Sequence, residues 1–514
     1  MNHKLRSAVI ATAGALTLGF GVNAMADTTD DLLNALIAKG VLTEEEGALL
    51  LKGRSIENDN KKTAIVPKFK DGISLESADG KHSISINGRV QADYHAYGKS
   101  DAQNTNSFDV RRAYLTAKGK IYNDYDVNVS ADFGQGQSVS CAAGASCRAT
   151  NQLDVAYFGI NWWPQAKFRF GQFDMPFGLE HLTSDLFTDF TERSFTDALV
   201  PGKERGAMVH GAPFKGVYYG LAASNGRGKS VNNADNQVDG VDIIGRATVN
   251  LAEVMEQAGV VYHVGGDFSH GYISPNQATN SGTLATNSFL VGQGAAASQT
   301  EGRGITFFTP TGLSAPAGED VKRTRLGLEG AVAIGPVKLQ SEWMKHNYTG
   351  NNNAIAAGAG LPAVAAGSYD KDVTAWYVSA NWLVTGESYA DTYKDGVWGR
   401  IKPKNNFEHG DAGFKGAGAW VIGLRYSDYD ASDFSSGVGR VGLVNGAGTS
   451  KTPDGAHAWT AGVTWIINPN LRFAANYIDT KLIDGVAGIK NNQGAVIGTT
   501  DGEQALTLRG TFDF

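Results

Sequence analysis

Arginine and lysine side chains recur at alternating positions of several apolar segments. Arg472 lies between Leu471 and Phe473, and Arg509 follows Leu508 in the same way. A guanidinium group presents a rigid fork of donors that fits phosphate or carboxylate oxygens, so a row of such groups is suited to anions. If the apolar neighbours face the other way, the cations that share one side are Arg112, Lys167, Arg169, Arg246, Arg325, Lys338, Arg425, Arg472 and Arg509.

These cations belong to segments in which apolar and polar side chains alternate strictly, the pattern of a two-faced β-strand. In residues 124–133, apolar side chains occupy the odd positions from Tyr125 to Phe133 and polar ones the even positions from Asp126 to Asp132. The pattern recurs in residues 337–343, 471–477 and 506–514. Strands with one oily and one wet face are typical of membrane barrels. A secreted β-sandwich alternates similarly, but rarely with so many strands in one linkerless chain.

The connections between the strands alternate in length, as in an outer-membrane barrel with short turns at one end and long loops at the other. Tight turns are expected at 119–123, 163–165, 213–216, 335–336 and 468–470. Long loops rich in Gly, Asn or Ser are expected near 135–150, 175–204, 225–240, 269–322, 349–371, 430–456 and 481–502.

Strand parity requires one exception to this alternation. Strand directions can be counted back from Phe514 and forward through residues 372–383. The two counts agree only if the segment 384–416 begins and ends at the short-turn, periplasmic end. This basic connection contains Arg400, Lys402 and Lys404. With it, the chain is predicted to be an all-β, antiparallel, transmembrane barrel of sixteen strands.

The N-terminus is predicted to be a signal peptide of residues 1–26. Lys4 and Arg6 precede an apolar run over residues 8–20, and small residues at 24–26 suit cleavage after Ala26. The alternative is a buried N-terminal helix. After residue 26 no continuous apolar run is long enough to span a bilayer as a helix.

Residues 27–55 follow helical spacing. Thr43 and Glu46 form an expected capping box at the start of a second helix. A capping pair of helices and a self-associating, coiled-coil-like periplasmic segment both fit this pattern. Residues 56–84 are expected to be a linker leading into the barrel, and residues 85–514 the barrel itself.

The composition agrees with a barrel. The chain has 65 glycines, which suit tight turns, and only 13 prolines. Its 10% of aromatic residues suits the girdles of a barrel at the membrane interfaces. The net charge of -7 does not exclude a locally basic pore. The two cysteines, Cys141 and Cys147, are expected to form a small disulfide in an outer loop. A metal site would need further ligands, which the sequence does not offer.

At this point family motifs become recognisable. The run FDVRRAYLTAKGKIYNDYDVNVSADFG (108–134) resembles the phosphate-selective porin O/P family. Similar runs are KFRFGQFDMPFGLEHLTS (167–184), TERSF (191–195), NWLVTGESYADTYKDGVWGRIKP (381–403) and AWVIGLRYSD (419–428). The resemblance implies a sixteen-stranded trimeric barrel, with the third loop folded inward as a constriction and a periplasmic connection that enters the lumen.

The expected pore-lining set combines the wall cations with cations of the third loop and the connection. Its members are Arg112, Lys167, Arg169, Arg193, Arg246, Arg325, Arg400, Lys402, Arg425, Arg472 and Arg509. The competing interpretation is that these cations form ion pairs within the wall, with inward acids such as Asp93, Asp132, Asp154 and Glu342. The third loop is more acidic than a dedicated phosphate filter should be. Its only cations are Arg193 and Lys203, and its six acids are Glu180, Asp185, Asp189, Glu192, Asp197 and Glu204.

The sequence therefore predicts a non-enzymatic outer-membrane porin for small hydrophilic solutes, with a preference for phosphate or other inorganic anions. The alternatives are a non-selective porin and a surface-interaction barrel with cation preference. A barrel enzyme is disfavoured because the histidines are scattered and form no nucleophile pattern. Expected partners are a homotrimer, outer-membrane lipid and lipopolysaccharide, the barrel-assembly machinery through Phe514, and small anions. No cofactor, metal or nucleic acid is expected, and the N-terminal segment is placed in the periplasm.

Overall fold

The computed structural model describes residues 37, 39, 43–46, 65–69, 72–98, 106–134, 153–226, 228, 229, 241–273, 298–308, 313, 319–354, 357, 363–411, 413–437, 451–490 and 496–514. The predicted signal peptide, most of the segment 27–55, and Cys141 and Cys147 lie outside these residues. The chain divides into two units, one of Met1–Val66 with Ser77–Gly80 and one of Pro67–Glu76 with Lys81–Phe514. In the first unit the predicted capping box is present, because Thr43 N donates to Glu46 Oε2 at 2.9 Å and Glu46 N donates to Thr43 Oγ1 at 3.2 Å.

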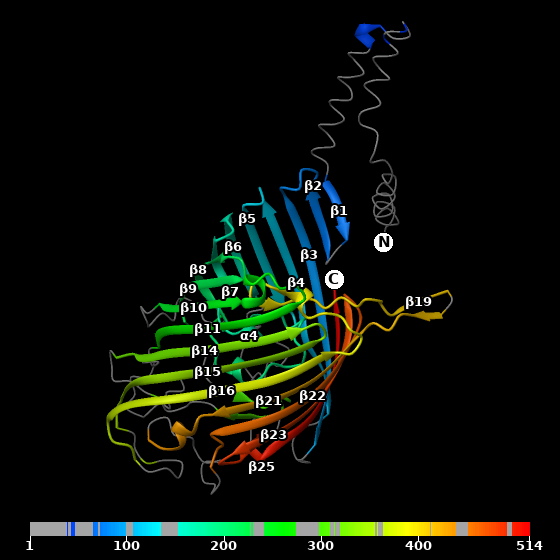
Figure 1. Ribbon diagram of the computed structural model, residues 1–514. Helices are drawn as coiled ribbons and strands as arrows, with labels where there is room; N and C mark the ends of the chain where they lie inside the picture. The colour runs from blue at the N-terminus through cyan, green and yellow to red at the C-terminus, as the bar shows by residue number, and fades with distance from the viewer. Residues whose placement is uncertain are drawn as a thin grey trace, which may run out of the picture. The chain divides into compact units, whose positions relative to one another are not determined.

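The second unit is a closed antiparallel barrel of 16 strands, as the alternation predicted. Each strand pairs with the next, and β26 pairs with β3 to close the ring (Figure 1). Closure gives every strand two hydrogen-bonded neighbours, which is the condition for crossing a bilayer as strands. In chain order the strands are β3 (Ser83–Gly98), β4 (Ser107–Ile121), β5 (Tyr125–Asp132), β6 (Leu153–Trp163), β7 (Ala166–Asp174), β8 (Lys203–Phe214), β9 (Val217–Ser224), β10 (Asp242–Asn250), β11 (Val260–Ile273), β14 (Val321–Ile334), β15 (Val337–Asn352), β16 (Gly367–Leu383), β21 (Ala419–Asp430), β22 (Gly455–Asn468), β23 (Leu471–Ile483) and β26 (Gly502–Asp513).

Shorter elements lie before the barrel and in its connections. The stretch predicted as a linker contains β1 (Ile65–Phe69) and β2 (Ile73–Ser77), and β2 pairs with the first residues of β3, Ile73 opposite Ile86. The loops contain α4 (Leu179–Leu182), η1 (Phe195–Ala198), α5 (Leu251–Val254), β12 (Ser298–Gln299), β13 (Thr306–Phe308), η4 (Ser432–Ser435), β24 (Ala487–Lys490) and β25 (Val496–Thr500). Among the described residues, no helix is both long enough and apolar enough to cross a membrane.

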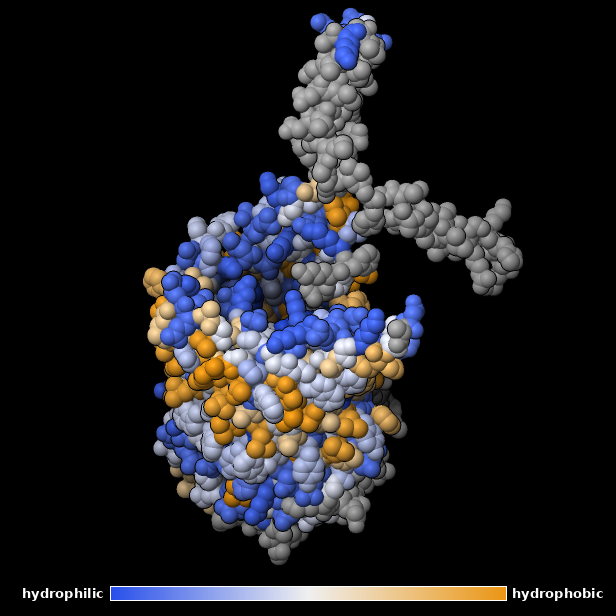
Figure 2. Space-filling view, turned by 45° about the vertical axis from the view of Figure 1, so that its right-hand side comes forward, coloured by the Kyte–Doolittle hydropathy of each residue, from blue (hydrophilic) through white to orange (hydrophobic). Residues whose placement is uncertain are grey.

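The two faces of the wall differ as the alternation predicted. On β15, Leu339 is half exposed whereas its inward neighbours Lys338 and Gln340 are buried. In the view of Figure 2, hydrophobic residues gather in a band across the outer wall, between more hydrophilic regions. The wall therefore offers an apolar surface to lipid and a charged surface to the lumen.

The connection between β16 and β21, residues 384–418, lies at the short-turn end, as parity required. It contains η3 (Ala390–Thr392), β17 (Tyr393–Lys394), β18 (Val397–Trp398), β19 (Glu408–Gly410) and β20 (Gly413–Lys415). Its first half packs against the inner wall, where Lys338 Nζ lies 4.6 Å from the ring centres of both Tyr389 and Trp398. Its second half forms the hairpin that carries β19, which extends away from the barrel wall (Figure 1).

Candidate pore constriction

The third loop, residues 175–202 between β7 and β8, folds into the barrel. Its start is anchored on the far wall, where the Glu342 carboxylate of β15 accepts hydrogen bonds from Leu179 N at 2.8 Å and Glu180 N at 2.7 Å. Phe177 and Leu179 are fully buried. A carboxylate that accepts two backbone donors holds the loop in place and also satisfies groups that would otherwise be unpaired inside the barrel.

The acids of this loop are paired with cations of the wall. Glu192 binds Arg111 and Arg509, at 2.8 and 2.6 Å, and Asp185 binds Arg112 at 2.5 Å. Further pairs are Glu180–Arg425 at 3.0 Å and Asp189–Lys338 at 2.6 Å. Burial alone would raise the pKa of Glu192, but the neighbouring guanidinium groups outweigh it and hold that pKa well below its ordinary value. Glu192 is thus ionised, and each of these loop acids has a wall cation beside it.

Arg111 is a pore residue that the alternation pattern could not identify. Regular alternation turns only one of two adjacent residues inward, and the sequence analysis selected Arg112. The register of β3 and β4 shifts between Gln91 and Ala92, so that Arg111 is an extra residue on β4. This β-bulge lets both arginines reach the third loop.

A second inward segment contributes to the same region. Residues 298–308, from the loop between β11 and β14, place Glu301 2.6 Å from Arg425 and 2.7 Å from Thr460 Oγ1. Arg303 lies 4.0 Å from Glu192. The sequence analysis treated residues 269–322 as an outer loop, because loop composition does not show whether a loop folds inward.

Arg193 holds the third loop together. Its guanidinium donates hydrogen bonds to three backbone oxygens, those of Glu180, His181 and Thr183, at 3.1, 3.0 and 2.9 Å. The same side chain lines two cavities, one with β3 to β6 and one with the inward segment 298–308. Arg193 therefore stands between two open spaces of the lumen.

The larger cavity has a volume of about 560 Å³. Of the described side chains that line it, seven are cationic, namely Arg89, Arg112, Lys118, Arg193, Lys203, Lys229 and Arg400, and four are carboxylates, namely Asp154, Asp174, Asp185 and Asp513. This excess of cations makes the local field favourable to anions.

Four predicted pore-lining arginines do not face an open path. Arg246, Arg325, Arg425 and Arg509 are at most 5% exposed. Arg246 binds Glu329 at 2.8 Å, and Arg509 binds Asp93 at 2.6 Å. Alternation placed these side chains correctly on the inner face, but the inward loops and the long connection cover them. These arginines are paired with acids inside the barrel, as the competing interpretation expected.

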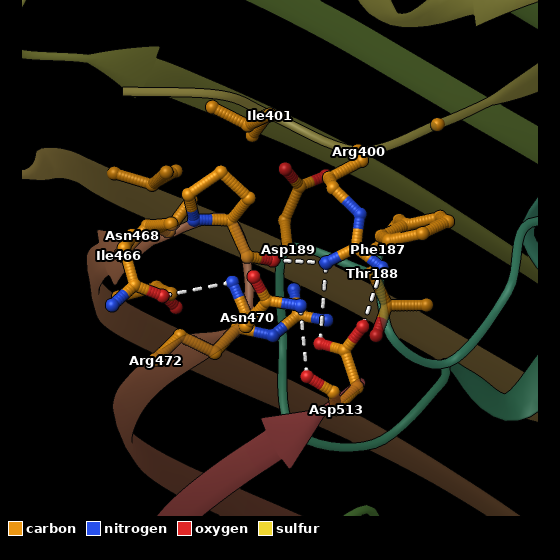
Figure 3. A pocket seen from close by; sticks show the side chains of 14 residues that line it. Phe187, Thr188, Asp189, Arg400, Ile401, Ile466, Asn468, Asn470, Arg472 and Asp513 are labelled. Carbon is orange, nitrogen blue, oxygen red and sulfur yellow. Dashed lines mark hydrogen bonds and ion pairs between the residues drawn. The ribbon is translucent and has the colours of Figure 1, made fainter. Parts of the chain in front are cut away.

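The remaining predicted residues are spread over the lumen. Arg169 stacks on the Tyr157 ring at 4.2 Å, and Lys167 lies near it on β7. Arg400 binds Asp513 and lies 5.1 Å from the centre of the Phe187 ring, beside Arg472 in a small pocket near the end of β26 (Figure 3). Lys402 is exposed on the connection.

A chain of alternating charges follows the wall of the larger cavity. His181 Nδ1 lies 2.6 Å from Asp197, and its Nε2 lies 3.5 Å from Asp174. Asp174 is 3.2 Å from Lys203, which in turn approaches Asp154. Burial alone would lower the pKa of His181, but the two carboxylates outweigh it and raise the pKa above the ordinary value. Within the described chain, no cluster of three or more His, Cys, Asp or Glu side chains could hold a metal ion.

Comparison with known proteins decides the family. Residues 84–485 match phosphate-selective porin O and P. The chain belongs to this porin family. It is 26% identical to Porin O of Pseudomonas aeruginosa over 438 residues. The aligned region covers 84% of this chain and 89% of that protein. Solved structures with a similar fold include an anion-selective porin from Comamonas acidovorans (TM-score 0.46, 11% identity, 84% of this chain and 100% of that one) and OmpF of Salmonella typhi (TM-score 0.45, 13% identity, 87% and 100%).

The porin is a channel protein of the outer membrane and not an enzyme. The third loop and the segment 298–308 meet inside its lumen, where Glu180 and Glu301 bind the same wall residue, Arg425. The residues that the sequence analysis missed are Arg89 on the inner face of β3, Arg111 at the bulge of β4, and His181, Glu301 and Arg303 on the inward segments.

Proposed function

We propose that this porin passes small hydrophilic solutes with a modest preference for inorganic anions, phosphate among them. The observation that carries the proposal is the charge of the larger cavity, where cationic side chains outnumber carboxylates seven to four. Carboxylates of the third loop, which would otherwise repel anions, are held by Arg111, Arg112 and Arg425. An anion therefore meets a net positive wall on its way past Arg193.

The preference is modest because the same pairing weakens each cation as a binding site. Arg112 and Arg89 share Asp185, and Lys203 is divided between Asp154 and Asp174. A phosphate ion must compete with these carboxylates for every donor. Conduction itself needs several weak sites in preference to one strong site, since the ion has to leave as well as enter.

Currents through planar bilayers test both parts of the proposal. With chloride on one side and phosphate on the other, we expect comparable permeabilities, and a phosphate permeability tenfold or more above that of chloride would contradict the modest selectivity. Replacing Arg112 by Glu should shift the reversal potential toward cations. The matched control is Lys215→Glu, a lysine exposed at the turn between β8 and β9 and paired with Glu256.

We also propose that the porin assembles as a homotrimer and that the segment 27–55 supports the assembly from the periplasm. The family resemblance and the leucine-rich helical pattern support this proposal. Contacts with lipopolysaccharide, and recognition of Phe514 by the barrel-assembly machinery, belong to the same proposal. Native mass measurement in mild detergent should give three copies, and a purely monomeric barrel would contradict it.

A further inference from the structure

The hairpin formed by β19 and β20 is fixed to the barrel at its base. Phe407 N donates to Ile467 O of β22 at 2.8 Å, and within the connection Gly418 N donates to Asn405 O at 3.0 Å, which closes the base of the hairpin. Glu408 lies opposite Lys415 in the register of the two strands. The hairpin is therefore an ordered extension of the wall beside β22, outside the lumen and apart from the constriction.

One side of the hairpin continues into a stack of aromatic rings. The Phe407 ring lies 5.1 Å from that of Phe414 and 5.0 Å from that of Trp465, and Trp465 stacks on Trp420 at 5.3 Å. Both indole N–H groups donate to Ala417 O, at 3.1 and 2.9 Å. These bonds hold the rings in place while Phe414 remains 69% exposed.

This aromatic surface is continuous with the outer wall of the barrel. Trp420 and Trp465 occupy outward positions of β21 and β22, and the next outward residues are Ile422 and Val463, which are 47% and 40% exposed. These apolar side chains belong to the face that lipid must cover. The hairpin thus begins where the lipid-facing band ends.

We propose that the β19–β20 hairpin is a membrane anchor that inserts its aromatic side into the phospholipid headgroup region of the periplasmic leaflet. Tryptophan and phenylalanine rings suit this depth, because their bodies are apolar and the indole N–H has a polar partner. Lys402 and Lys404 are exposed in the chain that leads into the hairpin, and Lys415 is exposed on the hairpin, as are Glu408 and Asp411. Lysines at the rim place their ammonium groups among phosphates while their stems cover apolar surface.

Phospholipid fits this surface better than a second copy of the chain. The stack is continuous with the apolar band of the wall, and its exposed rings, Phe414 and Trp420, are of the types enriched where a barrel meets the membrane–water interface.

Site-directed spin labelling of the full-length protein in phosphatidylcholine vesicles tests the anchor. Phe414→Cys would carry the nitroxide, in a background with Cys141 and Cys147 replaced by Ser. We expect the ratio of oxygen collisions to collisions with a water-soluble nickel chelate to lie between the ratios of the two reference labels below. A ratio equal to that of the label in water would show a hairpin in water, and protection from both reagents would show a protein contact; either result overturns the proposal. Leu424→Cys on the lipid-facing wall and Glu319→Cys in an outer loop are the reference positions.

The anchor and the proposed selectivity fail independently. The hairpin lies outside the lumen, so Phe414→Ser should leave the reversal potential of the open channel unchanged. The same substitution should lower the fraction of protein that folds into vesicles. An unchanged folded fraction would count against the anchor, whereas loss of anion preference in the unsubstituted protein would count only against the proposed selectivity.

Discussion

Arg111 and Glu192 form a two-pronged ion pair, with Nε 2.8 Å from one carboxylate oxygen and Nη2 3.2 Å from the other. Arg111 reaches the third loop because a β-bulge turns it inward beside Arg112. Glu192 also binds Arg509, so two wall guanidinium groups share a single loop carboxylate. This relationship reconciles an acidic third loop with a lumen that favours anions.

Replacing Glu192 by Gln should strengthen the anion preference. The substitution removes one negative charge beside Arg111, Arg303 and Arg509. A unit charge about 4 Å away is worth about 1 kcal/mol in water, so we expect the anion-to-cation permeability ratio to rise by up to about fivefold. Reversal potentials in bilayers measure this ratio. Glu319→Gln, in an exposed part of an outer loop, is the matched control, and an equal shift in both variants would contradict a local effect.

Replacing Arg425 by Gln should destabilise the barrel more than it changes selectivity. Arg425 is 1% exposed and binds both Glu180 and Glu301, so its loss leaves two carboxylates without their cation. Breaking a buried pair of this kind costs about 3–5 kcal/mol. Urea unfolding in vesicles measures the change. Arg169→Gln, which removes cation–π contacts with Tyr157 and Phe173 and, among the described residues, no ion pair, should cost clearly less, and equal costs would argue against the charge network.

The anion preference should fall as pH rises through the neutral range. His181 has a raised pKa, so it stays protonated to a higher pH than an ordinary histidine and adds a positive charge to the wall of the larger cavity. Deprotonation removes this charge. The same proton stabilises the loop, with the full contribution present below the ordinary pKa of about 6.5 and lost as pH rises through the raised pKa. Reversal potentials measured against pH should show the decline in the wild type and not in His181→Gln. A preference that strengthens with pH would contradict the role of His181.

Deleting Phe514 should lower the folded fraction. Phe514 N donates to Gly88 O at 2.9 Å, and Gly88 N donates to Phe514 O at 3.0 Å, next to the seam where β26 meets β3. Loss of these bonds shortens the pairing that closes the barrel. Heat-modifiable mobility on mild detergent gels reports the folded fraction. Phe514→Tyr, which keeps the backbone bonds and the ring, should fold like the wild type.

The barrel could be predicted from the sequence because each wall residue contacts either lipid or the lumen, which gives the strands an alternating pattern. Alternation placed Lys338, Arg472 and Arg509 on the inner face. Strand parity located the long connection. The constriction could not be predicted to the same depth. Whether Arg246 and Arg425 are open or covered depends on loops that fold back into the barrel, and loop composition carries no such information. Arg111 was missed because a bulge changes the register without a sequence signature. The disulfide between Cys141 and Cys147 remains a prediction, which alkylation without reduction followed by intact-mass measurement would test.

The most direct measurement is the reversal potential of the unmodified porin in a potassium chloride gradient across a planar bilayer. The cations that line the larger cavity, together with the pairing of Glu192, Asp185 and Glu180, predict a potential of the sign given by chloride as the more permeant ion. A potential of the opposite sign would mean that the loop acids govern the pore in spite of their partners. The proposed anion preference would then be wrong for this member of the family.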